Sequence, residues 1–158
     1  MKRLLKCYQP ILVFFICVAI LTACGDFLSG NKKTVLGLYL KSTEAYELLK
    51  QDVNNNIMFD VRTIAEVKQG SPTLAEAHVP IFLVEQNKVV FNKDFVSTVE
   101  EHLKKKGLDK ESTILMICRQ GNRSAKAVDI LAKLGYKKVF NVVDGVHGWK
   151  DNNLPLSF

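Results

Sequence analysis

Apolar residues gather in short blocks along residues 38–156, and polar residues separate these blocks. Short, mostly apolar blocks bounded by turn-forming residues predict buried strands. Between the blocks, apolar residues recur at helical spacing, which predicts helices with one buried face. The expected strands are residues 38–40, 57–59, 81–84, 89–91, 113–117 and 139–143, and the expected helices are residues 42–50, 63–68, 94–106 and 125–134.

The expected strands and helices alternate, and most of the strands are apolar throughout. Strands with helices over both of their faces have this composition, whereas half-exposed strands alternate apolar and polar residues. The pattern therefore predicts an α/β fold with a mostly parallel central sheet and helices on both faces. Residues 86–88 are expected to form a turn. About 120 residues are enough for one core, and we place this single domain at residues 37–158.

The first 23 residues have the pattern of a secretory leader rather than of a folded element. Lys2, Arg3 and Lys6 form a basic start, and residues 11–21 are an unbroken apolar run. Leu21-Thr22-Ala23-Cys24 then supplies small residues before a cysteine, as at a cleavage site. These four residues resemble the lipobox of bacterial lipoproteins, in which the cysteine is lipidated and becomes the new N-terminus. The resemblance implies a signal peptide at residues 1–23, a lipid on Cys24 and a tether at residues 24–36.

An uncleaved membrane anchor is the alternative for the same segment. Residues 7–25 carry no formal charge, and a stretch of this length can span a bilayer. Both interpretations place the domain outside the cytoplasm, in the periplasm or on another extracytoplasmic face, tethered to a membrane. Gly25 after the cysteine favours the outer membrane, by resemblance to the sorting rule of Gram-negative lipoproteins.

The charge of the chain does not indicate a nucleic-acid partner. The formal net charge is +6, and the leader supplies three of the basic residues without any acidic one. The densest basic run, residues 104–106, falls at the end of an expected helix, where cations interact favourably with the helix dipole. No long basic stripe follows the sequence, so binding to a phosphate backbone is not expected.

Cysteine usage directs attention to a single thiol. Cys7 and Cys17 lie in the leader and Cys24 is the expected lipid site, so Cys118 has no partner for an internal disulfide. A leftover cysteine in an exported protein raises the question of a reactive thiol. The alternative is that Cys118 is an unreactive, buried apolar residue. The flanking Arg119 and Gly121 are not the apolar neighbours that this alternative would favour.

Cys118 stands where an expected strand ends and an expected helix, opening at Ser124, begins. A helix N-terminus and nearby guanidinium groups stabilise a thiolate. Gly121 removes a Cβ where the chain has to bend, which lets successive amides face inward and bind an anion. The candidate nucleophile is Cys118, and the candidate anion-binding residues are Arg119, Gln120, Gly121, Asn122 and Arg123.

This loop resembles the active-site loop of the rhodanese, or thiosulfate sulfurtransferase, family. Asp60-Val61-Arg62-Thr63 resembles the family's Asp-x-Arg motif after the second strand, and residues 141–156 resemble its closing Gly-Gly-x-x-x-Trp segment. The likeness covers residues 38–156. It implies a rhodanese-like fold and transfer of sulfane sulfur from an anionic donor such as thiosulfate. The sulfur would pass through a Cys118 persulfide to cyanide or a thiol, without a cofactor.

The sequence departs from the family pattern in two places. Ala77-His78-Val79-Pro80 replaces the usual Gly-His-Ile-Pro-Gly-Ala and comes later, after a longer loop at residues 70–76. That loop resembles a Pro-Thr-Leu-Ala segment of a bacterial subset. Asp144-Gly145 replaces the usual paired glycines.

Two other functions remain open. Phosphatases and arsenate reductases of this fold class have seven residues from cysteine to arginine, whereas Arg123 is the sixth residue here and Ser124 the seventh. The smaller loop favours sulfur over phosphate. A domain that only carries persulfide sulfur for a partner protein would keep the same cysteine.

Several polar residues are expected to support the site rather than to form it. Asp60 and Arg62 are expected to form a structural ion pair, with Arg62 in the pocket as the alternative. Ser124 is expected to open the helix after the loop. The histidines at residues 78, 102 and 147 have no metal-ligand spacing, so no metal site is expected. Trp149 is expected to fill the core.

Overall fold

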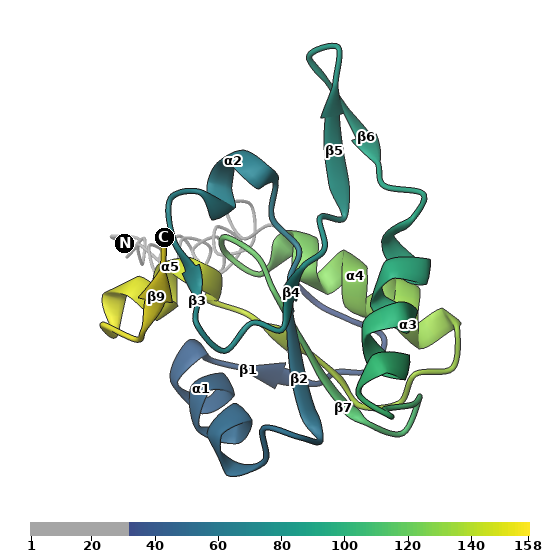
Figure 1. The fold of residues 1–158 in the computed structure, drawn as a ribbon, viewed down its shortest axis with the longest axis vertical. Helices are drawn as coiled ribbons and strands as arrows, with labels where there is room; N and C mark the ends of the chain where they lie inside the picture. The colour runs from purple at the N-terminus through teal and green to yellow at the C-terminus, as the bar shows by residue number, and fades with distance from the viewer. Residues whose placement is uncertain (1–31) are drawn as a thin grey trace, which may run out of the picture. The chain divides into compact units, whose positions relative to one another are not determined.

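A computed structural model describes residues 32–158 (Figure 1). Five parallel strands form the central sheet in the order β1-β8-β7-β2-β4. The expected α/β architecture is confirmed. The strands are β1 (Tyr39–Leu40), β2 (Asn56–Asp60), β4 (Ala77–His78), β7 (Thr113–Ile117) and β8 (Val139–Val142).

Helices cover both faces of this sheet, as the apolar strands predict. Along β7, Ile114 and Met116 pack with α3 (Phe95–Lys105) and α4 (Asn122–Lys133). Leu115 and Ile117 point the other way and pack with α1 (Ser42–Gln51) and α5 (Gly145–Asp151). Because successive strand residues face opposite sides, one strand supplies both cores.

Trp149 on α5 is fully buried and lies in the core on the α1 side, as expected from the sequence. Its indole ring packs edge-on against Tyr46, with 5.8 Å between ring centroids. The indole Nε1 donates to the carbonyl of Pro155 at 2.9 Å, so the buried polar atom is satisfied.

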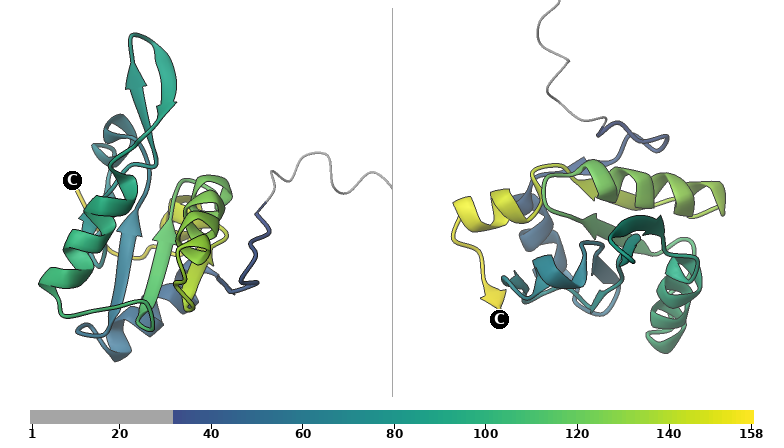
Figure 2. Two further views of the ribbon diagram at one scale, coloured as in Figure 1. Left: turned by 90° about the vertical axis from the view of Figure 1, so that its right-hand side faces the viewer. Right: turned by 90° about the horizontal axis from the view of Figure 1, so that it is seen from above.

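The expected strands at residues 81–84 and 89–91 form, but they do not join the central sheet. Among residues 32–158, β5 (Phe82–Glu85) and β6 (Lys88–Phe91) pair only with each other, in an antiparallel hairpin. Gln86 and Asn87 at its tip both have positive φ, which fits a two-residue turn. The hairpin projects from the body of the domain (Figures 1 and 2).

The sheet position next to β2 is taken instead by β4, which the sequence analysis did not predict. β4 has only two residues, Ala77 and His78. Neither has a large apolar side chain, so they do not form an apolar block that would predict a strand. The loop before it is held by β3 (Ser71–Pro72), which pairs antiparallel with β9 (Leu156–Ser157) near the C-terminus. The long loop at residues 70–76 is therefore fixed at both ends.

The expected leader, the lipid site at Cys24 and most of the expected tether lie outside the described residues. Residues 32–36, at the end of that tether, contact the domain. The amide of Val35 donates to the carboxylate of Asp129 at 2.8 Å. Among residues 32–158, no helix combines the length and apolar composition needed to cross a bilayer.

Candidate functional site

Cys118 follows β7 directly, at the sheet edge where the carboxyl ends of the parallel strands meet. Only 1% of the residue is exposed. Its sulfur nevertheless lies against polar donors. The amide of Gly121 donates to Sγ at 3.2 Å, and the hydroxyl of Ser124 lies 3.4 Å from it. The Cys118 sulfur therefore has two hydrogen-bond donors beside it, although the residue is buried.

Helix α4 begins two residues earlier than expected, at Asn122 rather than at Ser124. Gly121 caps it with φ of +91°, a left-handed conformation that a side chain disfavours. Its carbonyl accepts the amide of Ala125 at 3.1 Å and closes the first turn. Asn122, Arg123 and Ser124 therefore occupy that turn, where amides have no partner within the helix. The segment between β7 and α4 is therefore two residues shorter than expected.

Two backbone amides of helix α5 bind carbonyl groups of the Cys118 loop. The amide of Val146 donates to the carbonyl of Cys118 at 2.8 Å, and that of His147 to the carbonyl of Arg119 at 3.2 Å. Gly145 allows this approach. Its φ is +60°, and a Cβ there would collide with the carbonyl of Cys118. The retained glycine of Asp144-Gly145 is thus the one that the loop requires.

Asn141 on β8 contacts the candidate site, and the sequence analysis missed it. It is fully buried, and its Nδ2 donates to the carbonyls of Gly121 at 3.1 Å and Lys32 at 3.2 Å. Its Oδ1 therefore acts as an acceptor and receives the hydroxyl of Ser124 at 2.7 Å. The Ser124 proton thus has two acceptors, Asn141 and the Cys118 sulfur. The Asn-Val-Val segment gave no signal of this role, because an asparagine within an apolar strand has no motif of its own.

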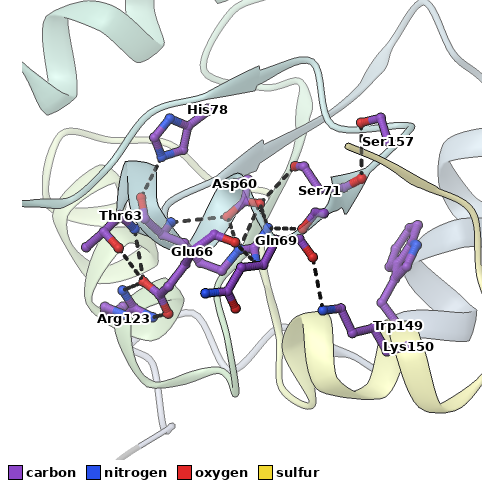
Figure 3. A network of polar contacts seen from close by, with 12 residues as sticks. Asp60, Thr63, Glu66, Gln69, Ser71, His78, Arg123, Trp149, Lys150 and Ser157 are labelled. Atoms are coloured by element: carbon purple, nitrogen blue, oxygen red, sulfur yellow. Dashed lines mark hydrogen bonds and ion pairs between the residues drawn. The ribbon is translucent and has the colours of Figure 1, made fainter.

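Arg123 is engaged by Glu66 on α2 (Ile64–Val67), a second residue that the sequence analysis missed. The guanidinium makes two short bonds to the Glu66 carboxylate, at 2.5 and 2.6 Å (Figure 3). Arg123 hydrogen bonding lowers the pKa of Glu66 to about 2, and the amide and hydroxyl of Thr63 act in the same direction. Bonding to Glu66 raises the pKa of Arg123. Arg123 therefore fixes α2 to the Cys118 loop.

Asp60 and Arg62 form a buried ion pair, which fits the structural role expected from the sequence. Arg62 Nη2 lies 2.6 Å from an Asp60 oxygen, and Nε donates to the same carboxylate. Arg62 also donates to the carbonyl of Gly70 at 2.8 Å. The hydroxyl of Ser71 donates to the carboxylate of Asp60 at 3.0 Å (Figure 3). The pair thereby connects the end of β2 to the start of the long loop.

The remaining loop residues, Arg119, Gln120 and Asn122, are exposed. Arg119 Nε donates to His147 Nε2 at 2.9 Å, and the Gln120 amide lies 3.1 Å from His147 Nδ1. The structure therefore gathers the loop, the Asp60–Arg62 pair and Ser124 at one sheet edge. Of the histidines, His147 joins this edge, and His78 contacts the carbonyl of Arg62.

Residues 42–152 match the Rhodanese-like domain family. The chain belongs to the rhodanese family. An uncharacterized Rickettsia prowazekii protein is 38% identical over 124 residues, which are 74% of this chain and 94% of that protein. Thiosulfate sulfurtransferase 18 of Arabidopsis thaliana is 32% identical, over 73% of this chain and 88% of its own.

Solved structures agree with this assignment. The polysulfide-sulfur transferase homodimer of Wolinella succinogenes is 26% identical, with a TM-score of 0.56 over 76% of this chain and 77% of its own. A Mycobacterium tuberculosis protein, at 22% identity and a TM-score of 0.60, shares the fold over 75% of this chain and 96% of its own. The rhodanese resemblance inferred from three sequence motifs is thereby confirmed.

Proposed function

We propose that this rhodanese is a sulfurtransferase that carries sulfane sulfur as a persulfide on Cys118. The observation that carries the proposal is the environment of the Cys118 sulfur. It accepts from the Gly121 amide and faces the Ser124 hydroxyl at the first turn of α4. A persulfide has an anionic terminal sulfur, and helix N-termini with converging amides stabilise anions. The relatives named thiosulfate sulfurtransferase and polysulfide-sulfur transferase support the same chemistry.

With thiosulfate as donor, the Cys118 thiolate attacks the outer sulfur. A new sulfur–sulfur bond forms to Cys118, the bond within thiosulfate breaks, and its electron pair leaves with sulfite. Cyanide then attacks the terminal sulfur of the persulfide, which gives thiocyanate and restores the thiolate. Neither step changes the proton count, so the loop needs anion stabilisation rather than a general base.

The test is an assay of turnover with thiosulfate and cyanide, in which the formation of thiocyanate is measured. We expect Cys118→Ser to lose sulfur transfer completely while its circular dichroism and thermal unfolding stay those of the parent. Retained transfer in this variant would exclude the mechanism. An aryl phosphate assayed in parallel addresses the phosphatase alternative. No hydrolysis is expected, because the arginine of the loop is the sixth residue and is held by Glu66.

Persulfide delivery to a protein is a second candidate function, favoured by the hairpin. Val84, Val89 and Phe91 are exposed there, at 62%, 70% and 45% of their surfaces. Adjacent exposed apolar side chains favour contact with another protein. The choice of acceptor distinguishes the two functions. A dedicated carrier should transfer sulfur from a preloaded Cys118 persulfide faster to a thioredoxin-type protein thiol than to cyanide or a small thiol, whereas an enzyme for small acceptors should not.

We also propose that the domain is anchored in a membrane by a lipid on Cys24, on the extracytoplasmic side and with the outer membrane favoured. The basic start, apolar run and Leu-Thr-Ala-Cys sequence support this proposal. Intact mass of the protein purified from its native membrane tests it. An acylated chain beginning at Cys24 is expected, whereas a chain that retains residues 1–23 would indicate the uncleaved anchor instead.

A further inference from the structure

The end of the expected tether lies against the domain, and we call this segment, residues 32–36, the strap. The Val35 amide donates to the carboxylate of Asp129 on α4 at 2.8 Å. Leu36 packs against the core cluster that includes Cys118. Figure 2 shows this start of the described chain beside α4. The strap is therefore held at two points before β1 begins.

A buried side chain joins the strap to the Cys118 loop. Asn141 on β8 is fully buried, and its Nδ2 donates to the carbonyl of Lys32 at 3.2 Å and to the carbonyl of Gly121 at 3.1 Å. Its oxygen accepts the hydroxyl of Ser124 at 2.7 Å. A side-chain amide has two protons to donate, so both are used here. The strap carbonyl thus helps to fix the orientation of the amide.

Asn141 contacts the same two residues that place donors beside the sulfur. Gly121 donates its amide to Cys118 Sγ at 3.2 Å, and its carbonyl accepts from Asn141. The hydroxyl of Ser124 lies 3.4 Å from Sγ and also bonds to Asn141. A movement of the Asn141 side chain therefore disturbs both donors at once.

We propose that Asn141 is a positioning residue for the Cys118 sulfur and that the strap keeps it in place. Release of the strap leaves one buried amide proton without its acceptor, which is unfavourable. The Asn141 side chain then turns, the two donors lose their alignment with the sulfur, and the reactivity of Cys118 falls. This inference rests on the role of Cys118 in the proposed function. Because the strap ends the expected tether, a pull on the tether would reach the sulfur along this path.

Val35→Pro releases the strap with little other change. The Gly37 amide donates to the carbonyl of Thr34 at 3.1 Å and closes a turn in which Val35 is the second residue. Proline is favoured at this position of a turn, and it has no amide proton to donate to Asp129. Val35 is 71% exposed, so the substitution removes little packing.

The first test measures the rate at which iodoacetamide alkylates Cys118 in the full, folded chain. Val35→Pro should slow this reaction about threefold, as for partial loss of one hydrogen bond to the sulfur. Val35→Ala keeps the amide and should react as the parent does. An unchanged rate in Val35→Pro would overturn the proposal. A faster rate would overturn it as well, because a strap that only shields the thiol would expose it on release.

A second pair of variants removes the same contact from the other side. Asp129→Ala should slow alkylation as Val35→Pro does, whereas Asp129→Asn keeps an acceptor oxygen and should restore the parental rate. Both variants lose the charge of Asp129, so the difference between them reports the hydrogen bond. Thermal unfolding is measured alongside. A strap with a purely structural role would lower the unfolding temperature in Asp129→Ala without changing the alkylation rate, and this result would contradict the proposal.

A double-variant cycle tests whether the strap acts through Asn141. Asn141→Ala should slow alkylation about fivefold, because both donors lose their contact with the amide. Adding Val35→Pro to Asn141→Ala should have no further effect, whereas two independent effects would multiply. Multiplied effects would show that the strap acts by another route and would overturn the proposal. The variants with an intact Asn141 decide the question even where Asn141→Ala does not fold.

These measurements are independent of sulfur transfer, because alkylation requires only the thiol of Cys118. If thiosulfate left no sulfur on Cys118, the proposed function would fail while the effect of the strap on alkylation would remain measurable. If Cys118 formed a persulfide but Val35→Pro reacted with iodoacetamide as the parent does, the strap proposal alone would fail.

Discussion

At the scale of single residues, the Ser124 hydroxyl links the Cys118 sulfur to the core of the domain. It lies between the Cys118 sulfur and Oδ1 of Asn141, and it has one proton to donate. The bond to Asn141 is the shorter of the two, at 2.7 Å against 3.4 Å to the sulfur. Rotation of the hydroxyl about its C–O bond is enough to direct the proton to either acceptor, without movement of the backbone.

Ser124→Ala removes this donor and should slow reaction of Cys118 with iodoacetamide at neutral pH about fivefold. The factor corresponds to about 1 kcal/mol for one long hydrogen bond to an anion. The measurement is the alkylation rate of the folded protein, followed by mass spectrometry. Ser124→Thr keeps the hydroxyl and should react as the parent does. An unchanged rate in the alanine variant would show that the Gly121 amide and the helix suffice.

The residues of the loop were predictable from the sequence, but their partners were not. Cys118, Gly121 and the Asp60–Arg62 pair belong to motifs that are local in the chain. Glu66 lies 57 residues from Arg123, and Asn141 lies 17 residues from Ser124. Such pairs depend on how α2 and β8 pack beside the loop, and spacing along the chain does not contain that information. For this reason the sequence analysis did not place Glu66 beside Arg123.

At the scale of elements, two short helices contact the Cys118 loop and the helix that follows it. α2 is attached to the first turn of α4 through Glu66 and Arg123. α5 binds the carbonyls of Cys118 and Arg119 through its first amides. Both helices are shorter than isolated helices need to be for stability. Their positions therefore depend on these contacts and on the core beneath them.

The attachment of α2 should depend on pH. Glu66 has a pKa lowered from 4.5 to about 2 in the folded protein, so its stabilising contribution is complete above pH 4.5 and is lost as pH falls towards 2. Glu66→Gln should reduce the free energy of unfolding by about 1–2 kcal/mol above that range, after allowance for partial exposure of the pair. Urea unfolding of both proteins across this range measures the difference, which should shrink on acidification.

A matched comparison is Glu101→Gln, which breaks the exposed pair of Glu101 with Lys105 on α3. Exposed pairs of this kind contribute little, so this variant should unfold as the parent does. A Glu66→Gln difference that persisted unchanged at the acid end of the range would contradict the assigned ion pair.

The attachment of α5 should depend on Gly145. A Cβ at this position would collide with the carbonyl of Cys118, and φ of +60° adds backbone strain. Gly145→Ala is expected to cost about 2–4 kcal/mol of unfolding free energy and to slow Cys118 alkylation. Gly107→Ala is the control, because Gly107 has φ of +69° but open space around its Cβ position. It should lose only about 1 kcal/mol, so equal losses would mean that contact with the loop is unimportant.

The sequence analysis predicted the elements that have a long apolar pattern. It did not predict short strands whose pairing depends on contacts between distant parts of the chain. β7 was expected at residues 113–117 and spans Thr113–Ile117. β4 has only two residues, and its place beside β2 follows from the path of the long loop. The start of α4 was placed too late, because the left-handed conformation of Gly121 lets the helix begin at once after the turn.

At the scale of the whole molecule, the sheet order explains why these parts meet. β8, β7 and β2 are adjacent and parallel, so the segments that follow them leave at one edge. Those segments are the start of α5, the Cys118 loop and the Asp60–Arg62 pair. Ligands bind at this edge in open α/β sheets. The alternation of strands and helices predicts this edge. The apolar pattern also predicts the two strands of the hairpin, but it does not tell whether they join the central sheet or pair with each other through the turn at Gln86 and Asn87.

The central claim is that Cys118 stores one sulfur atom between donor and acceptor. Incubation with thiosulfate, removal of excess donor and intact mass spectrometry test it directly. The expected result is a gain of one sulfur atom in the protein, located on Cys118 by peptide mapping, lost on addition of cyanide and absent from Cys118→Ser. A folded protein that gains no sulfur from thiosulfate or polysulfide, or gains it equally without Cys118, would contradict the account.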